Sequence, residues 1–125
     1  MSTILIVEDN AKNMKLVRDL LQYQGHRTVE AEDGESGVRL ALSEHPDLIL
    51  MDIQLPDIDG VTALARIRED AALCAVPCLA VSASVMPDEQ QRIVASGFDG
   101  FIAKPISLKS FLAAVQQALT RGRAR

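Results

Sequence analysis

The chain has 125 residues, of which 13 are basic and 17 acidic, so its net charge is −4. This length suits one domain with a buried core, and the acidic balance argues against nucleic-acid binding, which requires a basic face. The sequence is 48% hydrophobic but only 3% aromatic, so the core must consist mostly of Leu, Ile, Val, Ala and Met.

The sequence carries no sign of export or membrane insertion. Residues 1–10 lack the basic start and apolar run of a signal peptide, and no apolar stretch approaches the length of a membrane span. We therefore expect a cytoplasmic protein without membrane contacts. Cys74 and Cys78 suit a reducing compartment, and both histidines lie far from them in the sequence. Structural thiols are therefore favoured over a metal or redox pair.

The chain begins with a strand pattern followed by a helix pattern. Residues 4–7 are a β-branched apolar run, typical of a buried strand, which ends at Glu8 and Asp9. Apolar residues at helical spacing predict a helix over residues 11–24. Gly25 is well placed to terminate this helix.

A second strand and helix follow, and then the most apolar strand of the chain. Residues 27–31 alternate weakly and predict a short strand at a sheet edge. The next helix is expected to begin at residues 33–35 and to end at His45-Pro46, because the residue before a proline disfavours helical backbone. Residues 48–51 are four large apolar side chains that run directly into Asp52, a pattern typical of a strand covered on both faces. Taken alone, Asp52 is either a reactive or metal-binding carboxylate or a simple turn or N-cap residue.

The remaining elements repeat the alternation. Asp59 is a plausible N-cap for a third helix. Residues 77–81 predict a fourth strand that ends at residues 82–84, followed by a helix that Pro87 opens and Gly97 ends. Residues 101–103 predict a short fifth strand before Lys104 and Pro105, and Ser107 is expected to cap the last helix. Five strand–helix repeats predict a flavodoxin-like parallel sheet with helices on both faces and strand order 2-1-3-4-5.

Polar side chains stand at the carboxyl ends of four predicted strands, and these ends should share one edge of the sheet. They are Glu8 and Asp9, Asp52, Ser82, and Lys104. Converging carboxylates repel one another, and a hard cation such as Mg²⁺ relieves that repulsion. Together with an ammonium and a hydroxyl group, they could form a pocket for a tetrahedral anion on Asp52, which favours phosphoryl transfer to that carboxylate.

Over nearly its whole length the sequence resembles the receiver domain of two-component response regulators. The sequence segments near the start and the end of the chain are most similar to those of stand-alone DivK-like regulators. The matching segments are ILIVEDN at residues 4–10, DLILMDIQLP at 47–56, Asp59-Gly60, AVSA at 80–83 and Lys104-Pro105. Residues 1–121 would form the receiver domain and residues 122–125 a short basic tail.

The resemblance implies that Asp52 accepts a phosphoryl group from a histidine kinase. In this family, Mg²⁺ would be bound by Asp9, Asp52 and the backbone carbonyl of Gln54, with Glu8 assisting. The protein would then be a signalling phosphoacceptor that catalyses only its own phosphorylation and dephosphorylation, rather than an enzyme with a separate substrate.

The resemblance also implies how the signal is sensed. Lys104 would pair with the phosphoryl oxygens, and Ser82 would donate a hydrogen bond to one of them. Phe101 matches the switch aromatic of the family, where Tyr is common, so a plain core role stays an alternative. The family suggests a cis peptide bond between Lys104 and Pro105, which X–Pro sequences permit.

The partners implied are a sensor histidine kinase or phosphotransfer protein and a downstream protein target. No DNA-binding segment follows the last predicted helix, so we expect the output to be a protein–protein contact. The sequence leaves open which kinase and target these are and whether the chain forms a homodimer.

Three other functions fit the sequence less well. Residues 57–61 (DIDGV) imitate the nucleophile motif of haloacid-dehalogenase-type phosphatases, but that motif must directly follow a strand and here Leu55-Pro56 precedes it. An EF-hand fits less well, because Leu55 would occupy its first ligand position. An interaction domain that has lost phosphorylation is the other rival, although all five functional positions hold competent residues.

Overall fold

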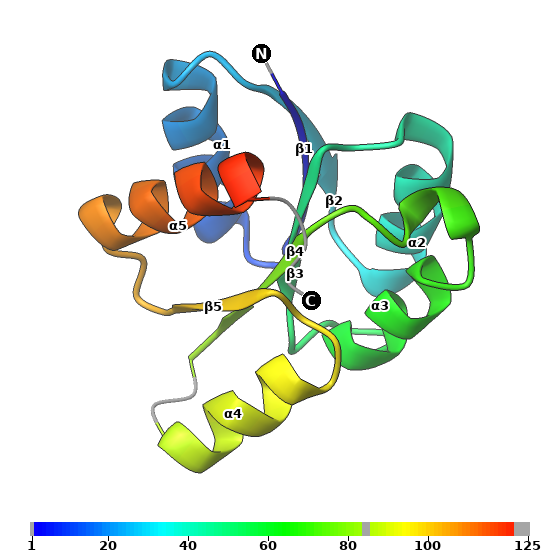
Figure 1. The fold of residues 1–125 in the computed structure, drawn as a ribbon. Helices are drawn as coiled ribbons and strands as arrows, with labels where there is room; N and C mark the ends of the chain where they lie inside the picture. The colour runs from blue at the N-terminus through cyan, green and yellow to red at the C-terminus, as the bar shows by residue number, and fades with distance from the viewer. Residues whose placement is uncertain (1, 84–85, 122–125) are drawn as a thin grey trace.

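The computed structural model describes residues 2–83 and 86–121. Its five strands form one parallel sheet in the order β2-β1-β3-β4-β5, which confirms the predicted flavodoxin-like topology (Figure 1). The most apolar runs, β1 and β3, are neighbours in the sheet. The strands are β1 Thr3–Val7, β2 Arg27–Ala31, β3 Leu48–Asp52, β4 Cys78–Ser82 and β5 Gly100–Ala103.

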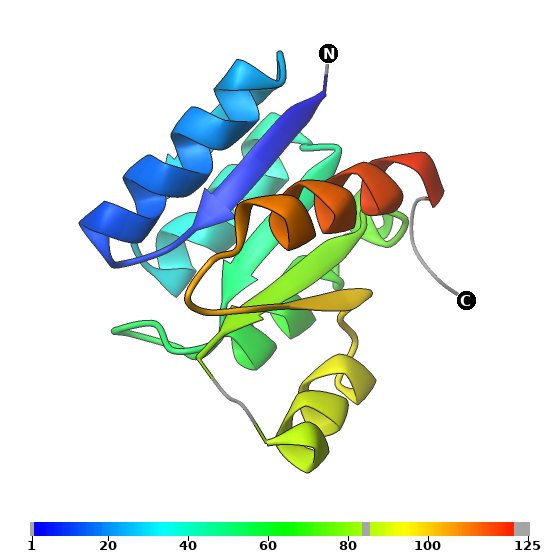
Figure 2. The same cartoon turned by 90° about the vertical axis from the view of Figure 1, so that its left-hand side faces the viewer.

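Helices cover both faces of this sheet (Figures 1 and 2). Helices α1 and α5 pack on one face, and α2, α3 and α4 pack on the other. None of these helices combines the length and the apolar composition needed to cross a membrane. The helices are α1 Ala11–Tyr23, α2 Gly34–Glu44, α3 Gly60–Ile67, α4 Pro87–Ala95 and α5 Leu108–Arg121, with a short 3₁₀ helix, η1, at Ala71–Leu73.

The sheet separates two apolar cores because alternate side chains of each strand point to opposite faces. Leu5 and Met51 lie in the core under α2, α3 and α4, whereas Ile4 and Leu50 lie in the core under α1 and α5. All five residues of β3 are buried. A strand covered on both faces needs the continuous apolar run seen in the sequence.

Several of the expected helix starts and stops are found in the structure. Asp59 accepts a hydrogen bond from the Thr62 N–H group at 2.8 Å as the N-cap of α3. Pro87 occupies the first turn of α4. Gly25, directly after the C-cap of α1, has φ of +89°, a left-handed conformation that glycine adopts without steric penalty. The Lys104–Pro105 peptide bond is cis, as the resemblance implied.

The structure corrects some boundaries. β4 begins and ends one residue later than predicted, so Ser82 is the last residue of the strand rather than the first residue after it. Ser84 and the tail at residues 122–125 lie outside the described residues. The 3₁₀ helix between α3 and β4 has no counterpart in the sequence-based expectations.

A buried ion pair organises this connection between α3 and β4. The guanidinium of Arg68 donates hydrogen bonds to the carbonyls of Leu73 and Val76 at 2.8 and 2.6 Å, and lies 3.3 Å from the Asp99 carboxylate. Asp99 also accepts a bond from the Cys78 N–H group at 2.9 Å. Asp99 is more than 20 residues from both Arg68 and Cys78, so local patterns could not reveal these two contacts.

The structure predicts that Gly60→Ala destabilises the protein, although alanine is usually the better helix former. An added Cβ would lie 2.5 Å from the carbonyl oxygen of Asp52 and 3.0 Å from the Cα of Ile53, and backbone atoms cannot move aside easily. We expect the free energy of unfolding, measured in urea, to fall by about 2 kcal/mol or more.

Gly25→Ala separates this clash from backbone strain. An added Cβ at Gly25 meets no atom within 4 Å, but φ is +89°, so we expect a loss of only about 1 kcal/mol. Equal stability of the Gly60→Ala variant and the wild type would show that the close approach of α3 to the end of β3 is not a constraint.

Candidate functional site

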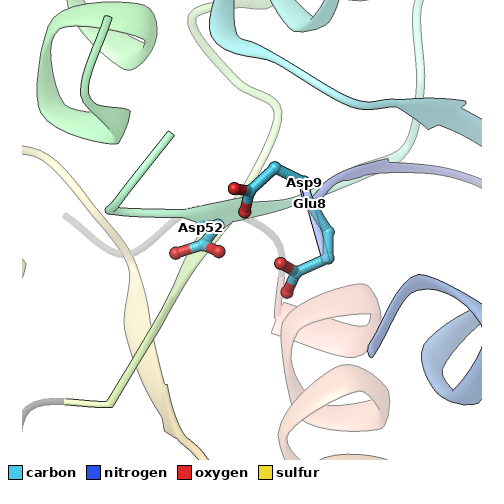
Figure 3. A group of neighbouring side chains, drawn as sticks. All are labelled: Glu8, Asp9 and Asp52. Carbon is cyan, nitrogen blue, oxygen red and sulfur yellow. The ribbon is translucent and has the colours of Figure 1, made fainter. Parts of the chain in front are cut away.

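Three carboxylates meet at the carboxyl ends of the two central strands. Val7 of β1 pairs in register with Met51 of β3, so Glu8 and Asp52 follow at the same level, and Asp9 comes next. One ligand oxygen from each of these three residues lies within 4.8 Å of the others. Figure 3 shows the three side chains gathered at this edge. The structure therefore brings together the acidic residues that the sequence predicted.

The three residues differ in exposure. The side chains of Glu8 and Asp52 are only 5% and 4% exposed, whereas Asp9 is exposed. Glu8 is buried because it directly follows β1, and Asp52 because it is the last residue of β3, and both strands are covered on both faces. Asp9 lies at the mouth of the site, where a ligand from solvent would first meet it.

Lys104 supplies the positive charge of the site. Its Nζ atom lies 2.9 Å from Oδ2 of Asp52 and 3.1 Å from Oε1 of Glu8, and its side chain is 19% exposed. Partial burial lowers the pKa of Lys104, but its bonds to Asp52 and Glu8 raise it more, so that the pKa lies above its ordinary value. The ammonium is therefore charged at neutral pH and balances part of the carboxylate charge.

Glu8 is the electrostatically strained member of the group. Burial raises its pKa, and a hydrogen bond with Asp52 raises it further, to about 7. The Asn10 N–H group, 3.1 Å from Oε2 of Glu8, and Lys104 lower the pKa by less. One ammonium is therefore not enough to hold both buried carboxylates fully ionised near neutral pH.

This donor set fits Mg²⁺. The ion prefers hard oxygen ligands, and the cluster offers carboxylate oxygens from Glu8, Asp9 and Asp52, with no His or Cys among its members. Burial and the neighbouring Asp52 raise the pKa of Glu8, and a divalent cation here would stabilise the charged form of both carboxylates. The residues present are thus chemically suited to a divalent metal.

The other predicted site residues lie around Asp52. The Gln54 N–H group donates a hydrogen bond to Oδ1 of Asp52 at 3.0 Å. Ser82 is buried at the end of β4, and its carbonyl accepts a hydrogen bond from the Lys104 N–H group at 2.9 Å. Gln54 and Lys104 therefore contact the Asp52 carboxylate directly, and Ser82 lies one residue beyond Val81, which pairs with Asp52 in the sheet.

Phe101 lies apart from the carboxylates. It is half-buried on β5, packs against the core under α2, α3 and α4, and lines a cavity of about 360 Å³ together with Gln90, Ser110 and Ala114. These residues come from α4 and α5, so the surroundings of Phe101 connect β5 with both helices.

The two acids of the phosphatase-like motif have structural partners. Asp59 caps α3. Both oxygens of Asp57 accept hydrogen bonds from backbone N–H groups at the start of α2, those of Gly34 and Glu35, each at 2.8 Å. The sequence gives no sign of this role of Asp57, because its partners lie more than 20 residues away and no local pattern marks them.

The raised pKa of Glu8 predicts that the metal-free protein loses stability between about pH 4.5 and 7. In that interval folded Glu8 keeps a proton that the unfolded chain, with an ordinary pKa of 4.5, has released. The stability contributed by Glu8 is therefore complete below about pH 4.5 and is lost as the pH rises through about 7. We expect this loss to be on the order of 2 kcal/mol and to be absent in Glu8→Gln.

Urea unfolding in the presence of a metal chelator, at a series of pH values, measures this difference. Glu69→Gln, at an exposed position after α3, is the matched control and should follow the wild type. A difference between wild type and Glu8→Gln that does not change with pH would contradict the electrostatic description of the cluster.

Comparisons with known proteins agree with this geometry. The response regulator receiver domain family matches residues 4–116. The polar-differentiation response regulator DivK of Brucella ovis is 40% identical over 117 residues, covering 94% of this chain and 95% of the relative.

Two solved structures are similar over nearly the whole chain. The receiver domain of sensor histidine kinase PA1611 from Pseudomonas aeruginosa, which has a magnesium ion in its active-site cleft, has a TM-score of 0.88 and 30% identity, covering 95% of this chain and 98% of that one. Chemotaxis protein CheY4 of Vibrio cholerae has a TM-score of 0.87 and 25% identity, covering 94% and 98%. The chain therefore belongs to the receiver domain family of two-component response regulators.

Proposed function

We propose that this receiver domain accepts a phosphoryl group from the phosphohistidine of a sensor kinase or phosphotransfer protein on Asp52, in a reaction that requires Mg²⁺. The observation that carries the proposal is the position of the Asp52 carboxylate. It lies 2.9 Å from the Lys104 ammonium and within 4.8 Å of the Glu8 and Asp9 oxygens. A nucleophile, a cation and a set of hard metal ligands thus share one sheet edge.

In the transfer step, a carboxylate oxygen of Asp52 forms a bond to phosphorus while the bond from phosphorus to the donor imidazole nitrogen breaks. The products are an acyl phosphate on Asp52 and a histidine that is free to take up a proton. The step needs mainly in-line positioning and neutralisation of the phosphoryl oxygens. The Gln54 N–H group and Lys104 hold the two oxygens of Asp52 in place beforehand.

Asp9, Asp52 and the backbone carbonyl of Gln54 would bind the metal, with Glu8 assisting. When bound, Mg²⁺ supplies positive charge to the phosphoryl oxygens in transit. After transfer, the ammonium of Lys104 would pair with a phosphoryl oxygen instead of Asp52, and the hydroxyl of Ser82 would donate a hydrogen bond to another. The same site would later admit water and release phosphate, so that the protein catalyses only its own modification.

We propose that the output is a change of protein–protein contacts on the surface built from α4, β5 and α5. Ser82 ends β4 and Lys104 directly follows β5, and Phe101 of β5 lines the cavity between α4 and α5. Phosphorylation would shift the population of an active arrangement through contacts that differ between the two states. Phe101 would take part by repacking rather than through a hydroxyl group. The downstream target would be a protein, and a homodimer is one form that such a contact could take.

Asp52→Asn tests the phosphoacceptor. The variant keeps the shape of the side chain but removes the nucleophile, so uptake of phosphate from acetyl phosphate and Mg²⁺ should be abolished. Mass spectrometry of the intact protein would show an adduct of roughly 80 Da on the wild type alone. Uptake by the variant at the wild-type rate would show that another residue is the acceptor, and a wild type without any adduct would favour a domain that signals without phosphorylation.

Lys104→Ala tests the link between phosphate and output. We expect the variant to take up some phosphate, because the nucleophile and the metal ligands are intact, but to lose the conformational response, because the charge that senses the phosphate is gone. Amide hydrogen exchange, with and without beryllium fluoride, measures this response. In the wild type, protection should change in residues 86–108, whereas changes confined to Glu8, Asp52 and α1 would refute this output surface.

A further inference from the structure

The loop between β3 and α3, residues 53–59, is attached to the sheet at its base. The Ile53 N–H group donates a hydrogen bond to the Val81 carbonyl of β4 at 3.1 Å, and the Gly60 N–H group closes the loop by donating to the Ile53 carbonyl at 2.9 Å. The lack of a side chain at Gly60 lets α3 approach the end of β3 closely. The loop begins directly after Asp52 and contains Gln54, whose N–H group bonds to the Asp52 carboxylate. Its base is therefore fixed at the functional site.

The far part of the loop is attached to a different element, helix α2. Both oxygens of Asp57 accept hydrogen bonds, each of 2.8 Å, from the N–H groups of Gly34 and Glu35 in the first turn of that helix. Burial raises the pKa of Asp57, but these N–H groups lower it more, so that it lies below its ordinary value. The carboxylate is thus ionised at neutral pH, where an anion at a helix N-terminus is favourable.

Helix α2 is itself fixed in position, because it packs closely on β1, the strand that leads to Glu8 and Asp9. An added Cβ at Gly37 would lie 2.8 Å from a methyl carbon of Val7, which shows how closely the helix approaches β1. Val7 directly precedes Glu8 and Asp9. Through Asp57, the loop that carries Gln54 is therefore tied to the helix that supports the strand leading to Glu8 and Asp9.

We propose that Asp57 is a positioning residue for the metal site. By holding the loop against α2, Asp57 keeps the Gln54 carbonyl close enough to Asp9 and Asp52 for all three to bind one divalent cation. The inference rests on the proposed function, in which that carbonyl is a ligand. Asp57 would act through the loop alone, since the partners seen for its carboxylate are the N–H groups of α2.

A purely structural role makes a different prediction. Helix α2 already has its own N-cap, because Asp33 accepts a hydrogen bond from the Ser36 N–H group at 2.7 Å. Removing either acid deprives the same helix terminus of a capping carboxylate, which costs about 1 kcal/mol of stability. Only the removal of Asp57 deprives the loop of its hydrogen bonds to α2. Asp33→Ala is therefore a matched control, which separates helix capping from loop positioning.

Isothermal titration calorimetry of the whole chain with Mg²⁺ tests the proposal on the wild type, Asp57→Ala, Asp33→Ala and, as a ligand-loss control, Asp9→Ala. We expect Asp57→Ala to weaken Mg²⁺ binding roughly tenfold, the lower end of the effect of outer-sphere residues on metal sites, and Asp33→Ala to bind like the wild type. Asp57→Asn keeps one acceptor oxygen and should fall between the wild type and Asp57→Ala. Without metal, the amide NMR signals of Ile53 and Gln54 should broaden in Asp57→Ala but not in Asp33→Ala.

The outcomes separate this proposal from the function on which it rests. Equal Mg²⁺ affinity of Asp57→Ala and the wild type, or an equal loss in Asp57→Ala and Asp33→Ala, would overturn the positioning role and leave the function intact. A wild type that does not bind Mg²⁺ would overturn both. If Asp57→Ala fails to fold, Asp57→Asn decides, and wild-type affinity in that variant would overturn the proposal.

Discussion

The functional site depends on the burial of two carboxylates, those of Glu8 and Asp52, beside the ammonium of Lys104. Two negative charges in a poorly solvated place repel each other strongly, and the raised pKa of Glu8 expresses this imbalance. A buried pair of this kind is unfavourable for folding. It persists because the strands that carry the acids are held by two large apolar cores, and it makes the site receptive to added positive charge.

The order of the strands explains how these groups meet. The crossover that places β3 beside β1 sets Asp52 level with Glu8. Lys104 comes from the edge strand β5 and must extend past the end of β4 to reach Asp52. Asp52 pairs with Val81, and Val81 pairs with Ile102, so Lys104 lies two residues beyond that level. Its long flexible side chain spans the remaining distance, which a shorter cation could not do.

The helices contribute more than cover for the sheet. Helix α2 packs closely on β1 through Gly37 and Val7 and receives the Asp57 carboxylate from the β3–α3 loop. Residues of α4 and α5 line one cavity together with Phe101 of β5. One side of the sheet edge is therefore held tightly, where metal ligands need fixed positions. The other side borders a cavity of about 360 Å³, into which side chains could repack.

The sequence alone determined the features that follow from short-range rules. Apolar runs of strand length and helical periodicity predicted all five strands and all five α-helices, and the alternation of these elements predicted the strand order. The carboxyl ends of parallel strands share one edge, so Glu8, Asp9, Asp52, Ser82 and Lys104 could be grouped before their positions were known. The chemistry of this group alone favoured Mg²⁺ and phosphoryl transfer to Asp52, and the resemblance to the receiver family implied the individual role of each residue.

Only the tertiary structure decided what depends on contacts between distant residues. The ion pair of Arg68 with Asp99 and the attachment of Asp57 to α2 join groups more than 20 residues apart, and no local pattern records such pairs. The pKa of Glu8 is likewise a property of the assembled edge, since it depends on burial and on the Asp52 carboxylate. Sequence patterns predict which side chains gather, whereas distances and burial set how strongly those side chains act on one another.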